Sequence, residues 1–209
     1  MRLIAAFVFA VISALTLTSP ATAGLPTDTM KTTTDKVVAV LQDTSLKSPA
    51  REAERRKKIR AAVYDVFDFG EMAKRSLATA WRDRTPQEKK EFTDLFANLL
   101  ERSYINRIES YSGEKISYDT ESVDGEYAVV KSRFFNKRKE EINVDYKLLK
   151  EDAGWMVYDV VVEGVSLVNN YRVQFSKIIR SSSYDGLVKK LKDKALGEEL
   201  AAPASNGKK

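Results

Sequence analysis

The sequence predicts an α+β domain in which helices cover one face of a curved antiparallel four-stranded sheet. First, the hydrophobic period changes from helical spacing before Ser112-Gly113 to alternation after it. Second, helical spacing returns from Leu167 onward. Third, turn residues separate the alternating segments, which is the pattern of hairpins. A concave sheet with helices across its mouth leaves a hydrophobic cavity unless side chains fill it, so this fold class predicts a cavity.

Three helices are expected in the first part of the chain. A first helix is predicted from Thr27 to Leu46, and Ser48-Pro49 ends it. A second helix opens with the highly charged residues 51–60, and we interpret its basic cluster as a solvated face. After a break at Asp68-Phe69-Gly70, a short third helix is expected from Glu71 to about Ala80.

A long fourth helix is predicted from a well-formed start. Thr85 can cap it, Pro86 suits its first position, and Glu88 can return a hydrogen bond to complete a capping box. The helix is expected to run to about Tyr111. Its apolar side is wide and comprises Phe92, Leu95, Phe96, Leu99, Leu100, Ser103, Tyr104 and Ile108.

Four alternating segments predict the strands. Ile142–Leu148 alternates most regularly, residues 116–120 do the same, and Tyr127–Phe135 is a looser strand. In the last strand Met156, Tyr158, Val160 and Val162 are predicted to form one face. The turns between strands are expected at Asp124-Gly125, Asn136-Lys137 and Asp152-Ala153-Gly154. A helix then follows from Leu167, and a last amphipathic helix begins at Ser183.

The two ends of the chain are predicted to lie outside the folded domain. Arg2, an apolar run over residues 3–17 and Ala21-Thr22-Ala23 together predict a signal peptide over 1–23, cleaved after Ala23. We therefore expect an exported protein with one domain over residues 24–196. The small, polar segment over 197–209 is expected to be a disordered tail.

The composition argues against catalysis and against metal or cofactor binding. The chain has no cysteine and no histidine, which removes the usual ligands of zinc and copper and the commonest general base. The sequence holds no glycine-rich phosphate loop and no nucleophile elbow. Asp65, Asp68 and Glu71 are interpreted as helix caps and surface charges. The net charge of +5 does not require nucleic acid, although it permits weak attraction to anionic membranes.

Three blocks of the mature chain resemble the MlaC family of periplasmic phospholipid-binding proteins. They are residues 67–73 (FDFGEMA), the region 81–96 with its TPQE start, and residues 155–175 from WMVYDV through EGVSLVNNYRVQF. The resemblance implies a periplasmic carrier that shuttles glycerophospholipid as its cargo, without a cofactor, to maintain outer-membrane lipid asymmetry. It also implies two partners, an outer-membrane lipoprotein–porin complex and an inner-membrane ABC transporter with an MCE-domain ring. We expect a monomer that binds no nucleic acid.

A lipid carrier needs an apolar pocket for the acyl chains, and we predict that three groups of residues line it. The first group is the inner sheet face: Val144, Tyr146, Met156, Tyr158 and Val160. The second is a helical cover: Phe69, Met72, Ala73, Leu77 and Trp81. The third comes from the long helix and the returning segment: Leu99, Ser103, Tyr104, Val165, Val168 and Tyr171. Arg75, Lys74 or Arg172 could contact the head group. A charged residue in place of Val160 or Leu99 is expected to release the lipid without unfolding the protein.

Two alternatives to a lipid carrier stay open from the sequence. The first is a small-molecule isomerase-like enzyme of the cystatin-like α+β roll type, with Asp or Tyr as acid and base. The missing histidine argues against it. The second is a periplasmic adaptor that binds only proteins, for which the apolar residues would simply fill a core. The ligand found in the purified protein distinguishes these three classes.

Overall fold

The computed structural model describes residues 25–135, 140–194 and 196. The expected signal peptide over 1–23, the tail over 197–209 and the turn at Asn136-Lys137 lie outside these residues. The elements in chain order are α1 (Pro26–Gln42), η1 (Thr44–Leu46), η2 (Pro49–Arg51), α2 (Glu52–Tyr64), α3 (Phe69–Leu77), η3 (Ala78–Trp81), α4 (Pro86–Glu109), β1 (Ile116–Asp124), β2 (Tyr127–Phe135), β3 (Glu141–Glu151), β4 (Gly154–Val162), β5 (Val165–Ser166) and α5 (Leu167–Lys192).

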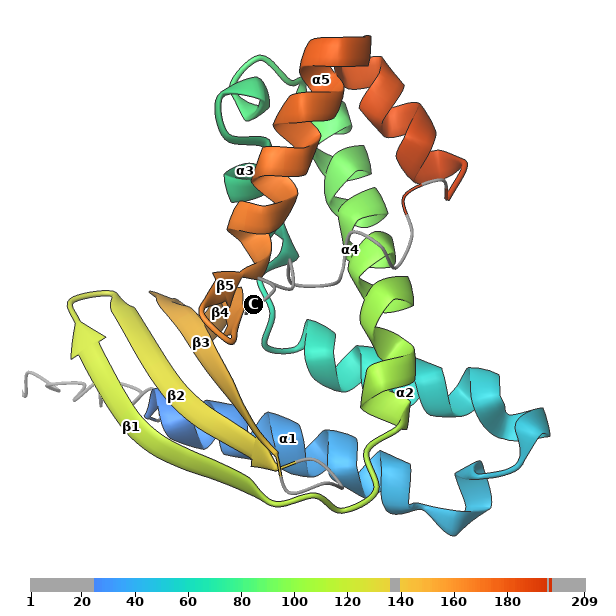
Figure 1. Ribbon diagram of the computed structural model, residues 1–209, viewed down its shortest axis with the longest axis vertical. Helices are drawn as coiled ribbons and strands as arrows, with labels where there is room; N and C mark the ends of the chain where they lie inside the picture. Colours follow the sequence, from blue (N-terminus) through green and yellow to red (C-terminus); the bar gives the residue numbers. More distant parts are fainter. Residues whose placement is uncertain (1–24, 136–139, 195, 197–209) are drawn as a thin grey trace, which may run out of the picture.

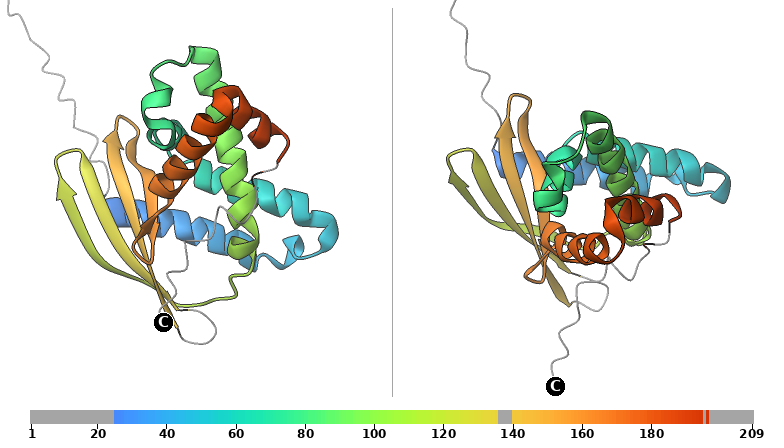
Figure 2. Two further views of the ribbon diagram at one scale, coloured as in Figure 1. Left: turned by 45° about the horizontal axis from the view of Figure 1, so that its top comes forward. Right: turned by 90° about the horizontal axis from the view of Figure 1, so that it is seen from above.

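The strands form one antiparallel sheet in the order β1-β2-β3-β4-β5, which confirms the predicted α+β class. The helices gather on one side of this curved sheet (Figure 1, Figure 2). The number of strands differs from the prediction, because the two-residue β5 pairs with the end of β4. It forms because Glu163 and Gly164 both take positive φ, at 49° and 78°, which is the geometry of a type I′ hairpin turn.

The long helix begins as predicted. The Thr85 hydroxyl accepts a hydrogen bond from the Glu88 amide at 3.2 Å, and the Glu88 carboxylate accepts one from the Thr85 amide at 2.7 Å. This capping box satisfies two backbone donors that a helix start would otherwise leave unpaired. The predicted break before the last helical segment is also found, because Ser183 inside α5 has the non-helical angles φ 80° and ψ 170°.

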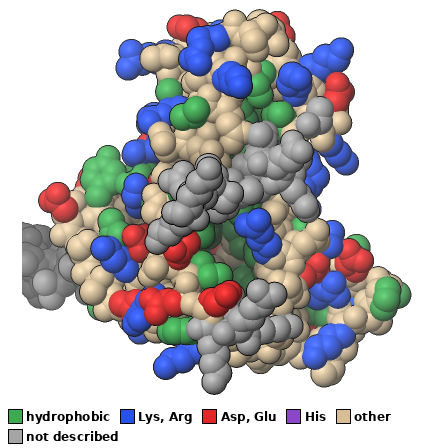
Figure 3. Space-filling model, in the orientation of Figure 1, with side chains coloured by type: hydrophobic (Ala, Val, Ile, Leu, Met, Phe, Trp, Pro, Cys, Tyr) green, Lys and Arg blue, Asp and Glu red, His purple; other side chains and the backbone are tan. Residues whose placement is uncertain are grey.

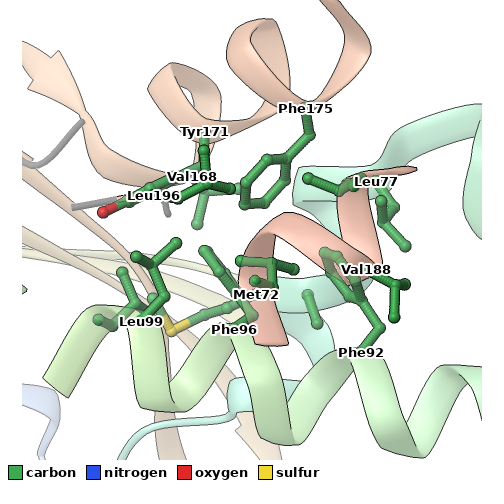
Figure 4. Packing of buried hydrophobic residues seen from close by; sticks show 14 of the residues in the cluster. Met72, Leu77, Phe92, Phe96, Leu99, Val168, Tyr171, Phe175, Val188 and Leu196 are labelled. Atoms are coloured by element: carbon green, nitrogen blue, oxygen red, sulfur yellow. The ribbon is translucent and has the colours of Figure 1, made fainter. Parts of the chain in front are cut away.

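One buried apolar cluster, which we call the helical core, joins α3, α4 and α5. Aromatic rings form its centre: Phe96 meets Tyr171 edge-on at 5.2 Å between ring centroids, and Phe92 meets Phe175 edge-on at 5.7 Å. Figure 4 shows these side chains pointing toward one another from α4 and α5. The buried members are Met72, Ala73, Leu77, Phe92, Phe96, Leu99, Leu100, Val168, Tyr171, Phe175, Tyr184, Leu187, Val188, Leu191 and Leu196.

A second buried cluster, the sheet cluster, lies between α1 and the inner face of the sheet. Its members are Met30, Ala128, Val130, Leu148, Trp155 and Val157. Helix α1 packs on β1 and β2, whereas α3 and α5 pack on β4. The domain thus has two packed regions, and its helices reach the sheet at two separate places.

Strand β4 carries a β-bulge that the sequence pattern did not reveal. β3 pairs Leu148 with Val157 and Lys147 with Asp159, so Tyr158 is an extra residue in β4. An extra residue shifts the alternation of side chains by one position. Every face assignment made by simple alternation therefore changes at this point in the strand.

The bulge corrects the predicted inner face. Before it, Trp155 and Val157 belong to the sheet cluster, with 7% and 0% of their surfaces exposed. After it, Val160 packs against the same cluster, as predicted. The prediction that Met156 shares this face is wrong, since Met156 alternates with the two buried residues beside it. The ring of Tyr158 packs edge-on against Tyr127.

The connection between α2 and α3 adds a short bridge to the free side of β4. The Val157 amide donates to the Val66 carbonyl at 2.7 Å, and the Asp68 amide donates to the Val157 carbonyl at 2.9 Å. The bridge fixes where α2 ends and α3 begins relative to the sheet. It also holds the two packed regions together through backbone hydrogen bonds.

Candidate ligand-binding cavity

An open cavity of about 410 Å³ lies between α1, the ends of α2 and α4, and strands β1–β3. Small-molecule sites typically measure about 300–1,000 Å³. The space-filling view shows a hollow with hydrophobic side chains between the sheet and α4 (Figure 3). The lining residues are Met30, Thr33, Thr34, Val37, Val38, Leu41, Val63, Phe67, Arg107, Ile108, Ser110, Tyr111, Glu114, Ile116, Phe134, Phe135, Ile142 and Tyr146.

Helix α1 supplies one wall through a stripe at helical spacing. Met30, Thr34, Val37 and Leu41 recur every three or four residues and so lie on one face, and Val38 lies beside Val37 at the edge of this face. Only Met30 of these is fully buried, and the others are half-buried. The stripe therefore keeps accessible apolar surface that other side chains do not cover, and a ligand can bind to this surface.

The sheet supplies the opposite wall through residues paired across strands. Ile116 pairs with Phe134, and Phe134 pairs with Ile142, so three apolar side chains stand side by side. Tyr146 continues this face along β3. All four side chains are half-buried. The wall is continuous and apolar across three strands.

Two tyrosines near these walls carry no charge at neutral pH. The Tyr118 hydroxyl hydrogen-bonds the Thr34 hydroxyl at 2.7 Å and ties α1 to β1. Burial raises the pKa of the Tyr118 phenol and also that of the Tyr146 phenol. Both phenols therefore stay protonated, and neither places a charge beside a hydrocarbon ligand.

Charge enters the lining only where α4 ends. Arg107 lies in the last turn of α4, with its guanidinium 5.8 Å from the centroid of the Tyr104 ring. Glu114 accepts hydrogen bonds from the Ser112 amide at 2.6 Å and the Ser112 hydroxyl at 2.9 Å. Apolar walls with a few charged groups at one end suit an amphipathic molecule.

Of the sixteen residues predicted from the sequence, Tyr146 lines this cavity and the other fifteen are not among its lining residues. Val160 packs beside Tyr146 against the sheet cluster, and Val144 is half-buried on β3. Ser103 is buried on α4, and Val165 lies in β5. Nine of the sixteen belong to the helical core or pack directly against it: Phe69, Met72, Ala73, Leu77, Trp81, Leu99, Tyr104, Val168 and Tyr171.

Sequence reasoning missed the α1 wall and the wall of paired strand ends. The signal was present in the sequence, since Met30, Val37 and Leu41 have helical spacing and Ile116 and Ile142 are apolar positions of alternating segments. Periodicity identifies an apolar face but does not tell whether another face fills the space against it. The helical core is filled and the α1 side is open.

The basic residues predicted for the head group are engaged elsewhere. Glu71 accepts hydrogen bonds from Lys74 and from Arg75, both at 2.8 Å. The Arg75 guanidinium also lies 4.1 Å from the centroid of the Tyr158 ring. Arg172 donates a hydrogen bond to Asn169. None of these cations lines the cavity.

The most buried carboxylate of the strands has a structural task. Asp159, with 4% of its surface exposed, accepts hydrogen bonds from the Ser166 hydroxyl at 2.6 Å and the Val168 amide at 3.0 Å. Both donors lie at the start of α5, where negative charge is stabilising. Lys147 lies 3.4 Å away on the neighbouring strand. Asp68 likewise caps α3 by accepting from the Glu71 amide at 2.9 Å, which confirms its interpretation as a cap.

Within the described ranges no group of three or more acidic side chains is placed to hold a metal ion. In the same part of the chain, no helix combines the length and the apolar character that a membrane span requires. The arrangement as a whole is an α+β domain with an open, apolar-walled cavity. Fold and site thus define a class of protein that binds a hydrophobic or amphipathic small molecule.

Comparison with known proteins agrees with this class. A phospholipid-binding protein from Ralstonia solanacearum, solved in complex with a phospholipid, superposes with a TM-score of 0.72 at 25% identity, over 86% of this chain and 100% of that one. A curated relative, the intermembrane phospholipid transport system binding protein MlaC of Haemophilus influenzae, is 24% identical over 129 residues. That match covers 57% of this chain and 58% of the relative.

The profile of the MlaC protein family matches residues 31–193. The chain belongs to the MlaC family. The resemblance noted from the sequence is thereby confirmed, and the match includes both walls of the cavity except Met30.

Proposed function

We propose that this protein is a periplasmic carrier that binds a glycerophospholipid by its acyl chains and moves it between the outer and inner membranes. The observation that carries the proposal is the open cavity between α1 and the sheet, whose walls are apolar and only half-buried. Membership of the MlaC family and the lipid-bound Ralstonia solanacearum relative support it.

The physical need for such a cavity follows from the cost of exposing hydrocarbon. Each methylene group moved into water costs about 0.8 kcal/mol, so two chains of about 15 methylenes oppose release by roughly 24 kcal/mol. A cavity of about 150 Å³ accepts one benzene molecule of six carbons. By that ratio, 410 Å³ accommodates about 16 carbons, or one acyl chain. Holding a second chain requires the cavity to widen.

The carrier role also implies a cellular compartment and partner proteins. We propose that residues 1–23 direct export and are removed after Ala23. The partners that fit a shuttle are an outer-membrane lipoprotein–porin complex and an inner-membrane MCE-domain ABC transporter. In this role the protein maintains outer-membrane lipid asymmetry, takes phospholipid as cargo and performs no catalysis. The use of Asp159 as a helix cap supports a non-enzymatic role, because a general acid or base needs a free carboxyl group near a cavity.

The test is the identity of the molecule that the protein carries. The full chain would be expressed with residues 1–23, and the exported protein would be purified without detergent and analysed by native mass spectrometry and lipid extraction. A bound diacyl phospholipid supports the carrier. A small polar metabolite favours an isomerase-like enzyme, and an empty protein favours the protein-only adaptor; either result would overturn the proposal. Transfer of a labelled lipid between two vesicle populations then measures the carrier activity itself.

A further inference from the structure

A second concavity, of about 380 Å³, lies on a different part of the molecule. It is formed by α2, the middle of α4 and the C-terminal end of α5, which descends beside α4 (Figure 1). We call it the basic pocket. Its lining residues are Arg60, Leu95, Asn98, Glu101, Arg102, Leu191, Lys192 and Lys194. It shares no lining residue with the apolar cavity.

The basic pocket has an excess of positive charge. Four lining residues are cationic and one is acidic, so the lining carries a formal charge of +3 (4 minus 1). Arg60 donates to Glu101 at 2.5 Å, and Lys192 pairs with Glu91 at 2.6 Å. Lys192 and Glu91 are both about half exposed, and exposed pairs contribute little to stability. An incoming anion can therefore recruit Lys192 at small cost.

One of the lining arginines has an unpaired donor. Arg102 Nη2 is buried and has no hydrogen-bond partner among the residues that the structure describes. Buried polar atoms in native proteins are nearly always paired, and an exception calls for a ligand, a water or an ion to satisfy it. A charged donor left unpaired is more costly than a neutral one. Arg102 thus adds to the lining a cation whose hydrogen bonds to the described residues are incomplete.

The helix dipole explains only part of this charge. Lysines in the last turn of α5 are favoured because the carbonyl end of a helix is negative. That reason does not apply to Arg60 on α2 or to Arg102 on α4. It also does not explain Lys194, which follows the helix end with φ 54°, a conformation that glycine adopts more readily. Three elements thus converge on one place with cations.

We propose that the basic pocket is a docking site for an acidic segment of a partner protein. Its carboxylates would pair with Arg102 and Lys194, and an apolar side chain between them would pack on the half-buried Leu95. A single phosphate ion is too small to use both the cations and Leu95 in a concavity of 380 Å³. A flat bilayer surface does not reach into a hollow between three helices. A protein segment with alternating acidic and apolar residues satisfies both features.

Binding would be measured on the full chain by fluorescence anisotropy of the labelled peptide EELEEL, with EESEES as the peptide control. The protein variants are Lys194→Glu and Arg102→Gln. Lys131→Glu is the control matched to Lys194→Glu, because Lys131 is exposed on β2 and its reversal changes the net charge by the same amount. Circular dichroism would verify that each variant is folded. Lys194→Gly is the additional variant should either of the first two unfold.

We expect saturable binding of EELEEL that weakens about tenfold in Lys194→Glu and in Arg102→Gln and changes less than about twofold in Lys131→Glu. Raising the salt concentration should weaken binding, and EESEES should bind less tightly. The proposal is overturned by absent or non-saturable peptide binding, or by equal effects of the pocket and control variants. It is also overturned if inorganic phosphate or phosphatidylglycerol vesicles, and not the peptide, show the dependence on Lys194.

Discussion

Val38 offers the sharpest test of where the acyl chain lies. It is half-buried in the α1 wall of the apolar cavity, so a carboxylate introduced there can remain hydrated through the open mouth. The fold should tolerate Val38→Asp, whereas a hydrocarbon chain should not. If the charge excludes about four methylene groups from the wall, the lost transfer free energy is about 3 kcal/mol. That value corresponds to roughly a 200-fold lower affinity.

The assay compares Val38→Asp with Val173→Asp, which adds the same charge on α5 at a residue that is 61% exposed. Bound phospholipid per mole of protein would be quantified after purification, and thermal unfolding would be followed by circular dichroism. We expect Val173→Asp to retain its lipid and Val38→Asp to lose it, with similar unfolding temperatures. Equal lipid content in the two variants would refute the assignment of the acyl chain to this cavity.

Leu99 provides the contrast within the same experiment. The sequence alone led to the expectation that a charge at Leu99 empties the protein without unfolding it. In the structure Leu99 has 0% exposed surface inside the helical core. An unpaired charge there costs several kcal/mol, which is a large part of the stability of a small domain. Leu99→Asp should therefore unfold the protein, and a folded but lipid-free variant would instead favour a ligand site in the helical core.

Three further variants test the local arguments. Thr85→Ala removes the capping box of α4 and should lower the free energy of unfolding by about 1 kcal/mol in urea titrations. Ser183→Gly should raise it by about 1 kcal/mol, since φ 80° with ψ 170° is strained for any residue but glycine; an unchanged value would show that the angle is not strained. Burial by itself would raise the pKa of Glu109, but hydrogen bonds from Arg56 and Arg55 outweigh it and lower that pKa. The stabilisation is therefore present above the unfolded pKa of about 4.3 and lost as pH falls through the folded value. Glu109→Gln should be less stable than the parent at pH 7, and the difference should shrink below about pH 4; a pH-independent difference would contradict this.

Local chemistry made much of the fold predictable. The TPQE start fixed the beginning of α4, because each residue has a defined task in the first turn. Alternation located β1 to β4, because successive side chains of a strand point to opposite faces of the sheet. The bulge at Tyr158 was not predictable, since residues 155–162 are apolar or aromatic except for Asp159, and the extra residue appears only when β3 is placed beside them.

The candidate site was less predictable than the fold. Leu99 and Val38 are both apolar residues on helix faces, and nothing in their spacing tells that one is packed solid and the other borders a cavity. That difference depends on the faces opposite: aromatic rings of α5 fill the space beside Leu99, whereas paired strand ends stand back from α1. Sequence periodicity identifies the apolar face of a helix, but it does not give the distance from that face to the element opposite.

The two edges of the sheet affect how readily the protein aggregates at high concentration. One rim is occupied where Val66 and Asp68 hydrogen-bond Val157, and β5 covers a further part of it. The opposite rim, β1, has an irregular register near Asp119, and its Glu121 carboxylate accepts hydrogen bonds from the Thr27 amide and hydroxyl at 2.7 and 2.6 Å. Acidic side chains and irregular pairing discourage strand-to-strand polymerisation. Sheet edges protected in this way should reduce fibril formation, although the chain has no cysteine and so no disulfide bond.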